Sequence, residues 1–474
     1  MSRASSWTLA LSLIVLPACE RGSAGGPASP ADATPAAQVN VALDPQRLVE
    51  DIEVLADDGW AGRFTKDLEH LSLAANYIAK SHEAAGLRPV GDSFLVDFEY
   101  PAGKKPGDGF YLWLEREADT VQLPEAEVVP AFFGPRRAVV GPPVWVAADS
   151  VDGVKGRPVL TPAPSGDLPA RIKALADAGA SAVLLVGDAS SAAAPVTEGP
   201  ISAAFISPQT ARETLGIVTD APRKAAEVAN LKVSLTRSEV DKTGTAPNVL
   251  AWIEGSEHPE EIVLLGAHYD HIGTKEFGTF CRGPSDDADP DDAICNGADD
   301  NASGTSVLMN IARAMGSSGY RPKRTIVFAS FAAEELGLHG SRALAEHPPA
   351  AAPFSSGTVV AMLNMDMVGR LGEEGLQVGG EKTSAAWPAL IAAEAPASLK
   401  IVHPASVTGR SDHAHWYRMG VPVLFFFTGL HDDYHRTSDE LSTLNLEGMT
   451  GIAELILGVT LALAEGAPVP PAPR

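Results

Sequence analysis

The chain has 474 residues, of which 45% are hydrophobic and 20% charged, a composition typical of soluble globular proteins rather than disordered or collagen-like ones. Its 60 acidic and 36 basic residues give a net charge of −24, which argues against a nucleic-acid partner because such partners favour a basic face. The length exceeds what one core usually holds, so we expect about two to three domains.

The first residues have the layout of an export signal. An apolar run from Trp7 to Leu16 follows one arginine and is too short to span a bilayer. The residues "LPAC" resemble a bacterial lipobox, in which Cys19 becomes the lipidated first residue; a plain signal peptide cut near Cys19 is the alternative. We predict a signal peptide over 1–18 and an exported protein, either a cell-envelope lipoprotein or secreted, that meets the membrane only through a lipid on Cys19.

The residue pattern after Cys19 predicts a flexible tether followed by helices. Residues 19–40 are rich in Gly, Pro and Ala without apolar periodicity, which is typical of a flexible tether. Leu48, Ile52 and Leu55 then recur at helical spacing, a second helical pattern follows, and short strand-like pieces come next. We assign residues 41–124 to the N-terminal part of the main domain.

Residues 125–236 have a different texture. Short strand patterns alternate with Pro and Gly turns around one expected helix at 167–180, and no His, Asp and Glu cluster together. The stretches "VDGVKGRPVL" and "IKALADAGASAVLLV" resemble a protease-associated domain, which implies a small β-rich domain inserted into a peptidase domain. A βαβ fragment of the main fold is the alternative.

The remaining chain predicts an α/β fold. Strand and helix patterns alternate from Ala246 onwards, which implies a mostly parallel mixed sheet sandwiched by helices. The expected strands are 248–255, 261–268, 324–335, 358–367 and 421–429, and the expected helices include 302–319 and 339–347. We assign 237–466 to the main domain, predict a disordered tail over 467–474, and expect no later transmembrane helix.

Metal-competent side chains stand at or beyond the C-terminal ends of several expected strands, where open α/β sheets place their binding crevice. One more carboxylate stands where a helix begins. In chain order these residues are His268, Asp300, Glu335, Asp366 and His435. Two zinc ions with one bridging carboxylate need about five such ligands, so the set suits a two-metal site.

Two acidic neighbours extend this pattern. Asp270 lies two residues beyond His268, so along an extended chain it points the same way and could accept the second ring N–H of that histidine. Glu334 would project differently from Glu335, which leaves it facing the open metal position as a general base.

Six stretches carry a resemblance to a known family. In order they are "GAHYDH", "NGADDNASG", "AAEELGLHGS", "LNMDMVG", "RSDHAHW" and "DYHRTSDE". Their order and spacing over about Pro247 to Leu444 resemble the secreted di-zinc aminopeptidases, relatives of glutamate carboxypeptidase II and the glutaminyl cyclases. The resemblance implies a zinc-exopeptidase fold of the phosphorylase/hydrolase-like type, two Zn²⁺ ions per chain and a peptide substrate.

The same resemblance implies a role for each residue. It assigns His268 and Asp366 to one zinc ion, Glu335 and His435 to the other, and Asp300 to the bridging position. Asp299 is not a ligand in that pattern.

The resemblance further makes Glu334 the general base and Asp270 the residue that orients His268. Tyr434 matches a tyrosine that stabilises the oxyanion in some relatives, although packing beside His435 is an equal alternative. Asp412 in "RSDHAHW" fits a motif that lines the site.

Alternatives to an aminopeptidase stay open on the sequence. A carboxypeptidase or dipeptidase of the same fold is the first, with Arg410 holding a free carboxylate. A glutaminyl-cyclase-like acyltransferase and a non-catalytic binding relative are the others, and the complete ligand set with Glu334 argues against both.

The connection from Thr274 to Asn296 is long and acidic, and Cys281 and Cys295 flank its acidic run. The two cysteines could pair in an exported protein, which would make the segment a flap pinned beside the site. Free thiols and a solvated surface loop are the alternatives.

Overall fold

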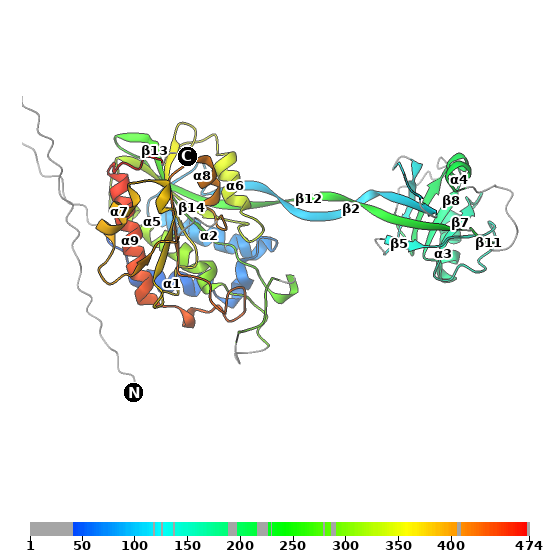
Figure 1. The fold of residues 1–474 in the computed structure, drawn as a ribbon, viewed down its shortest axis with the longest axis horizontal. Helices are drawn as coiled ribbons and strands as arrows, with labels where there is room; N and C mark the ends of the chain where they lie inside the picture. Colours follow the sequence, from blue (N-terminus) through cyan, green and yellow to red (C-terminus); the bar gives the residue numbers. More distant parts are fainter. Residues whose placement is uncertain are drawn as a thin grey trace, which may run out of the picture. The chain divides into compact units, whose positions relative to one another are not determined.

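The computed structural model describes residues 41–116, 119–124, 127–135, 138–187, 197–215, 226–228, 230–277, 280–285, 291–404 and 409–471. The predicted signal peptide (1–18) and tether (19–40), with Cys19, lie outside the described residues, as do 472–474. The described chain forms two sheets, each with its own buried core (Figure 1).

Two helices open the described chain as the apolar spacing predicts. Helix α1 (Pro45–Leu55) begins after Asp44, whose side chain accepts the N–H of Gln46, and has proline in its first turn. Helix α2 (Leu68–Ala84) begins after Asp67, which caps it in the same way. The apolar faces of both helices are buried in the main core.

The larger sheet has eleven strands in the described residues, in the order β17-β16-β18-β15-β13-β14-β12-β2-β3, with β1 and β5 also paired to β12. Their bounds are β1 Arg88–Pro89, β2 Leu95–Arg116, β3 Asp119–Leu123, β5 Ala138–Gly141, β12 Leu231–Ile253, β13 His258–His268, β14 Arg324–Phe331, β15 Thr358–Met365, β16 Leu376–Gly379, β17 Ile401–Val402 and β18 Val423–Phe427.

Parallel pairing is confined to the centre of this sheet and to one edge pair. Strands β13, β14, β15 and β18 pair in parallel, whereas β12 and β16 join them antiparallel. The predicted mixed sheet between helices is confirmed. The alternation of strands and helices in the sequence did not predict that β12 and β16 join the parallel strands antiparallel. Because the central strands are parallel, their carboxyl ends meet at one edge.

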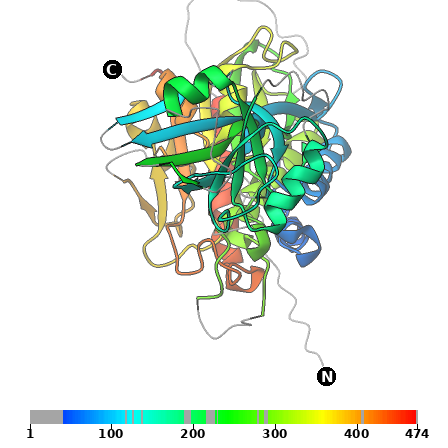
Figure 2. The same ribbon diagram turned by 90° about the vertical axis from the view of Figure 1, so that its right-hand side faces the viewer.

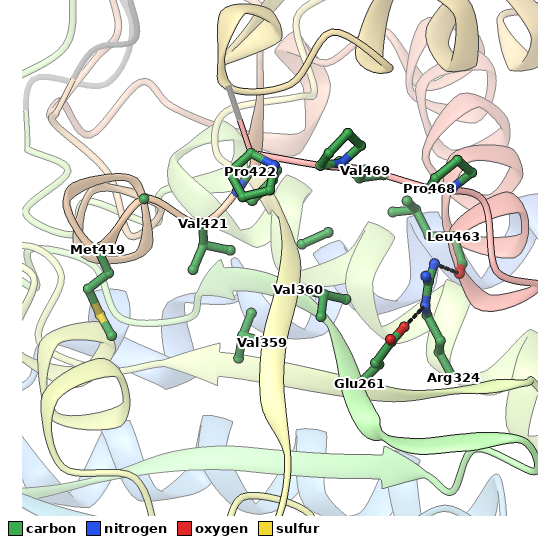
Figure 3. A pocket seen from close by; sticks show the side chains of 14 residues that line it. Glu261, Arg324, Val359, Val360, Met419, Val421, Pro422, Leu463, Pro468 and Val469 are labelled. Carbon is green, nitrogen blue, oxygen red and sulfur yellow. Dashed lines mark hydrogen bonds and ion pairs between the residues drawn. The ribbon is translucent and has the colours of Figure 1, made fainter. Parts of the chain in front are cut away.

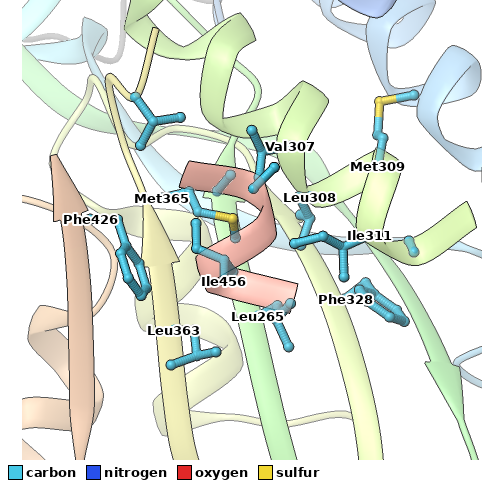
Figure 4. Close-up of a cluster of buried hydrophobic side chains, with 14 of the residues drawn as sticks. Leu265, Val307, Leu308, Met309, Ile311, Phe328, Leu363, Met365, Phe426 and Ile456 are labelled. Atoms are coloured by element: carbon cyan, nitrogen blue, oxygen red, sulfur yellow. The ribbon is translucent and has the colours of Figure 1, made fainter. Parts of the chain in front are cut away.

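Helices cover both faces of the central strands, so these strands are buried on both sides. Val263 and Leu265 face the core formed with α1, α2, α5 (Gly304–Ser317), α7 (Trp387–Glu394) and α9 (Leu446–Ala464), as the close-up in Figure 4 shows for part of it. Ile262 and Leu264 face the opposite core. That second core includes side chains of α6 (His339–Glu346) and α8 (Ala414–Met419).

The second sheet has the order β11-β6-β7-β8-β10-β4-β9. Its bounds are β4 Val129–Phe133, β6 Val144–Trp145, β7 Pro158–Pro162, β8 Ala182–Val186, β9 Thr197–Glu198, β10 Ser202–Ile206 and β11 Ala226–Glu227. Helices α3 (Leu168–Asp177) and α4 (Pro208–Leu215) pack on its two faces and are seen at the front of Figure 2.

This second sheet falls within the segment predicted to be a protease-associated insertion, and that assignment stays a prediction. Strands β2 and β12 pair along most of their length and add side chains such as Leu112 and Val233 to its core. The predicted C-terminal limit of this segment falls within a continuous strand, because β12 runs without a break through residue 236.

The disordered tail assigned to residues 467–474 stays a prediction. Its first residue, Ala467, accepts a hydrogen bond from Arg324 at 2.7 Å. Helix α9 is, among the described residues, long and apolar enough to cross a membrane. Its apolar side chains fill the main core, which accounts for that composition without a membrane.

Candidate functional site

The predicted metal-competent residues gather at the carboxyl edge of the central strands. His268 is the last residue of β13, and Asp366 directly follows β15. Glu335 lies in the turn after β14, which ends at Phe331, four residues before the end predicted from the sequence. His435 lies on a longer loop after β18, and Asp300 lies in the irregular turn before α5.

These five side chains form two groups that share Asp300. On one side, Nε2 of His268 is 3.3 Å from Oδ1 of Asp366 and 3.4 Å from Oδ1 of Asp300. On the other side, Nε2 of His435 is 3.3 Å from Oδ2 of Asp300 and 3.3 Å from Oε2 of Glu335. The two carboxylate oxygens of Asp300 thus face different groups.

The donor set and its spacing fit zinc. Ligands about 2.0–2.1 Å from a tetrahedral ion lie roughly 3.3 Å from one another, which matches the four separations above. Nε2 of His435 has no hydrogen-bond partner among the described residues and faces the carboxylates. Imidazole nitrogens and carboxylate oxygens are ligands that zinc accepts.

Burial disfavours the charged form of the carboxyl groups in this cluster. Burial, together with the nearby Glu335, raises the pKa of Asp300. Burial also raises the pKa of Glu334 well above its usual range, more than the neighbouring His268 lowers it. Buried carboxylates this close together need compensating positive charge, which divalent cations would supply.

The histidines respond in the opposite direction. Burial lowers the pKa of His435, but its close contacts with the carboxylates of Asp300 and Glu335 raise that pKa more, to about 10. Burial likewise acts to lower the pKa of His268, and the charges of Glu334 and Asp366 raise it well above its usual range. Both imidazoles therefore lie in a strongly negative field, which attracts cations.

Glu334 lies within reach of the His268 group. One ligand atom each of His268, Glu334 and Asp366 lies within 4.8 Å of the other two. Asp270 positions this glutamate through its carboxylate, which accepts the backbone N–H of Glu334 at 3.2 Å and the Thr65 hydroxyl at 2.7 Å. Burial raises the pKa of Asp270 to about 6.

The contact between Asp270 and His268 differs from the expected one. Nδ1 of His268 lies 3.0 Å from the backbone carbonyl of Asp270 and 3.8 Å from its carboxylate. The main chain therefore orients the imidazole, because the carboxylate is turned toward Thr65 and the backbone of Glu334.

The other predicted neighbours have distinct environments. The Tyr434 ring stacks on the His435 ring with centroids 3.9 Å apart, and burial raises the pKa of its phenol. The Asp299 carboxylate accepts the Gly369 N–H at 2.7 Å and lies 3.2 Å from Nε2 of His431. Asp412 is fully buried, and burial raises its pKa to about 7.

Sequence reasoning missed several residues that build the site. Nδ1 of His271 lies 2.8 Å from Oε1 of Glu335. The second histidine of "HYDH" could have indicated this residue from the sequence. The Asp439 carboxylate accepts the backbone N–H groups of Asp299 and Asp300. Arg63 is buried beside the site and donates only to backbone carbonyls, which no local pattern reveals.

A pocket lined by apolar residues lies at the opposite edge of the sheet (Figure 3). Val359 and Pro422, at or before the starts of β15 and β18, line it together with Pro468. Arg324 there pairs with Glu261 at 2.5 Å and donates to the Leu463 carbonyl at 2.9 Å. The charged groups in this pocket are thus engaged in packing the C-terminal segment.

Comparison with known proteins identifies relatives of the part of the chain that carries the site. Residues 248–460 match the family model described as Peptidase family M28. A probable zinc metalloprotease of Pyrenophora teres f. teres (strain 0-1) is 39% identical over 121 residues, which is 26% of this chain and 22% of that protein. A probable aminopeptidase of Saccharomyces cerevisiae is 31% identical over 229 residues, 46% of this chain and 57% of that protein.

The solved structure of BSAP, a zinc aminopeptidase from Bacillus subtilis, shares the fold. The match has a TM-score of 0.51 at 18% identity and covers 90% of this chain and 97% of that one. At this identity the likeness establishes the architecture alone. The chain spans 22% and 57% of the lengths of the two curated relatives above.

Proposed function

We propose, from the match of residues 248–460 to the model of Peptidase family M28, that the chain is a zinc-dependent exopeptidase that removes residues from the N-terminus of peptides. The observation that carries this proposal is the buried cluster in which Asp300 lies between two metal-competent groups with separations of 3.3–3.4 Å. The names of the relatives support a zinc peptidase, and that of the yeast relative supports aminopeptidase activity.

We assign two zinc ions to the cluster. His268 and Asp366 would hold one ion, Glu335 and His435 the other, and Asp300 would contribute one oxygen to each. Zinc in such a pair polarises the scissile carbonyl and lowers the pKa of bound water. The protein's own part is to hold these donors in a buried pocket with their lone pairs converging.

Glu334 is proposed as the general base. It lies beside the His268 group, and burial holds its pKa well above the usual range, which suits a group that accepts a proton and later returns it. The leaving amine of the peptide is the expected acceptor of that proton. Asp270 would keep Glu334 in place through the backbone N–H contact.

Two further assignments are part of this proposal. Tyr434, stacked on His435, would donate a hydrogen bond from its phenol to the developing oxyanion, and its raised pKa keeps the phenol protonated at neutral pH. The choice of an aminopeptidase over a carboxypeptidase is supported by the yeast relative, which is named a probable aminopeptidase.

The test combines metal content with substrate polarity. The purified chain is expected to contain about two zinc ions and to cleave aminoacyl anilides and peptides with a free N-terminus. Peptides with a blocked N-terminus should resist cleavage, and those with a blocked C-terminus should be cleaved. Glu334→Ala should keep the zinc and lose activity. Cleavage of N-blocked peptides from the C-terminus would refute the aminopeptidase assignment, and activity in Glu334→Ala would refute the proposed base.

We also propose that the chain is an exported lipoprotein anchored through Cys19 and that its second sheet is a protease-associated insertion. The lipobox-like residues before Cys19 support the anchor. Metabolic labelling with a palmitate analogue should mark the parent chain and not Cys19→Ser. Equal labelling of both would contradict the anchor.

A further inference from the structure

A short segment lies directly on the loop that carries His435. We call residues Cys281–Ser285 the clamp segment and residues 433–438 the His435 loop. The backbone N–H of Arg282 donates to the carbonyl of His435 at 3.1 Å, and the N–H of Thr437 donates back to the carbonyl of Arg282 at 3.0 Å. The two segments thus pair as a parallel β-bridge between Arg282 and Arg436, the residue that directly follows the proposed ligand His435.

Side chains extend this pairing in both directions. The Arg282 guanidinium donates to the carbonyl of Tyr434 at 2.5 Å. The Arg436 guanidinium donates to the carbonyl of Gly283 at 3.1 Å, so each segment contacts the other's backbone. Ser285 bonds the Asp433 carboxylate at the far end. Three of the five clamp residues, Arg282, Gly283 and Ser285, therefore bond the His435 loop directly.

A disulfide joins the clamp segment to the residues that directly precede Asp300. Cys281 is bonded to Cys295, five residues before Asp300, and both cysteines are buried. The N–H of Cys295 donates to the Gly273 carbonyl at 3.0 Å, which fixes this anchor to the segment after His268. The disulfide thus connects the surroundings of Asp300 covalently to the segment that holds His435.

His435 is the proposed ligand that most needs such support. His268 and Asp366 stand at or directly after strand ends, whereas His435 lies eight residues beyond the end of β18. Its φ is 58°, a left-handed conformation that a non-glycine residue keeps only when its surroundings impose it. Its side chain is also the most exposed of the five, at 18%.

We propose that the Cys281–Cys295 disulfide and the backbone of Arg282 form a clamp that positions His435 opposite Asp300 and Glu335 for the second metal ion. This inference rests on the proposed two-zinc function. Opening the disulfide should free the clamp segment, so that the His435 loop samples other conformations and holds that ion less tightly. The ion on His268 and Asp366 should be little affected, because β13 and β15 position those residues.

The experiment is a zinc titration of the full chain against a competing chelator of known affinity, which reports both binding steps without using activity. The double variant Cys281→Ser/Cys295→Ser is compared with the parent and with His435→Ala, which should lose one of the two binding steps outright. Disruption of supporting contacts around metal sites typically weakens binding by ~10–100-fold. We expect a change of that size in one step of the double variant and little change in the other.

A second measurement covers the case in which the double variant folds poorly. The folded parent is treated with a phosphine reductant, thiol release is counted, and the zinc titration is repeated. The reductant should weaken one step in the parent and leave the double variant unchanged.

The two failures are distinguishable. If the parent binds two ions and the reduced parent or a folded double variant binds both with unchanged affinity, the clamp is refuted and the proposed function stands. If the parent itself does not bind two ions, both proposals are refuted.

Discussion

Replacing Arg63 with methionine should destabilise the chain and weaken zinc binding together. Arg63 is 1% exposed, and its guanidinium donates to the carbonyls of Tyr269 at 2.9 Å, Asn296 at 2.7 Å and Gly297 at 3.1 Å, and also to that of Leu55. Tyr269 follows His268, Asn296 and Gly297 lead into Asp300, and Leu55 ends α1. One buried cation thus ties three parts of the chain together beside the site.

The expected magnitude follows from these contacts. A hydrogen bond that involves a charged group contributes about 1.5–3 kcal/mol, so the four bonds have a gross value of about 6–12 kcal/mol. Burying the charged guanidinium costs several kcal/mol of desolvation, and this cost is recovered when the group is removed. The same burial lowers the pKa of Arg63 to about 10, although the charge of Asp300 acts to raise it. A methionine stem keeps much of the packing but leaves the carbonyls without donors. We expect a net loss of about 4 kcal/mol.

The assay is urea unfolding of parent, Arg63→Met and Arg63→Lys in the presence of a chelator, followed by zinc titration of each folded protein. Lysine keeps the charge but offers one nitrogen in place of the planar fork, so it should recover only part of the loss. Near-UV circular dichroism at zero urea shows whether each variant is folded. A loss below about 1 kcal/mol in Arg63→Met, with parent-like zinc affinity, would refute the reasoning, because the four bonds could then not be holding these segments.

Three further predictions concern separate parts of the molecule. His271→Ala removes the 2.8 Å contact to Glu335, so zinc affinity in a chelator competition should fall by ~10–100-fold; unchanged affinity would contradict a supporting role. Burial raises the pKa of Glu440 to about 7 from 4.5, so the folded state retains its proton, and the stability this group contributes is full below pH 4.5 and lost as pH rises through about 7. Glu440→Gln should therefore raise the urea midpoint at pH 8 more than at pH 5; an equal gain at both would exclude this titration. Leu184→Ala, in the core of the second sheet, should lower stability by about 2–5 kcal/mol with zinc binding unchanged; altered zinc affinity would show that this core is coupled to the site.

The strand ends explain why much of the site could be predicted from the sequence. Apolar runs before His268 and Asp366 indicate buried strands, and the parallel-sheet rule brings their carboxyl ends to one edge. This rule predicts the position of a residue only to within a few residues along the chain. Glu335 was therefore expected at the strand end near the other ligands, although β14 ends earlier, at Phe331. The side of the cluster on which each ligand lies came from the family resemblance rather than from the rule.

The supporting contacts could not be predicted because they use backbone atoms. Arg63 donates to carbonyls over 200 residues away in sequence, and the Asp439 carboxylate accepts N–H groups about 140 residues away. Every residue carries a carbonyl and nearly every one an N–H, so the chemistry of the partner leaves no mark in the sequence. A side chain that binds the backbone can be found only once the fold has brought the segments together.

Asp270 shows how one residue can serve two parts of the proposed chemistry. Its carbonyl contacts the ring of His268, while its carboxylate accepts the backbone N–H of Glu334. The spacing in "HYD" suggested a carboxylate–imidazole contact, because alternate residues of an extended chain point the same way. The chain leaves the sheet at His268, so the following backbone turns its carbonyl toward the ring and frees the carboxylate for Thr65 and Glu334. A metal ligand and the proposed base therefore share one positioning residue, and a shift of Asp270 would displace both together.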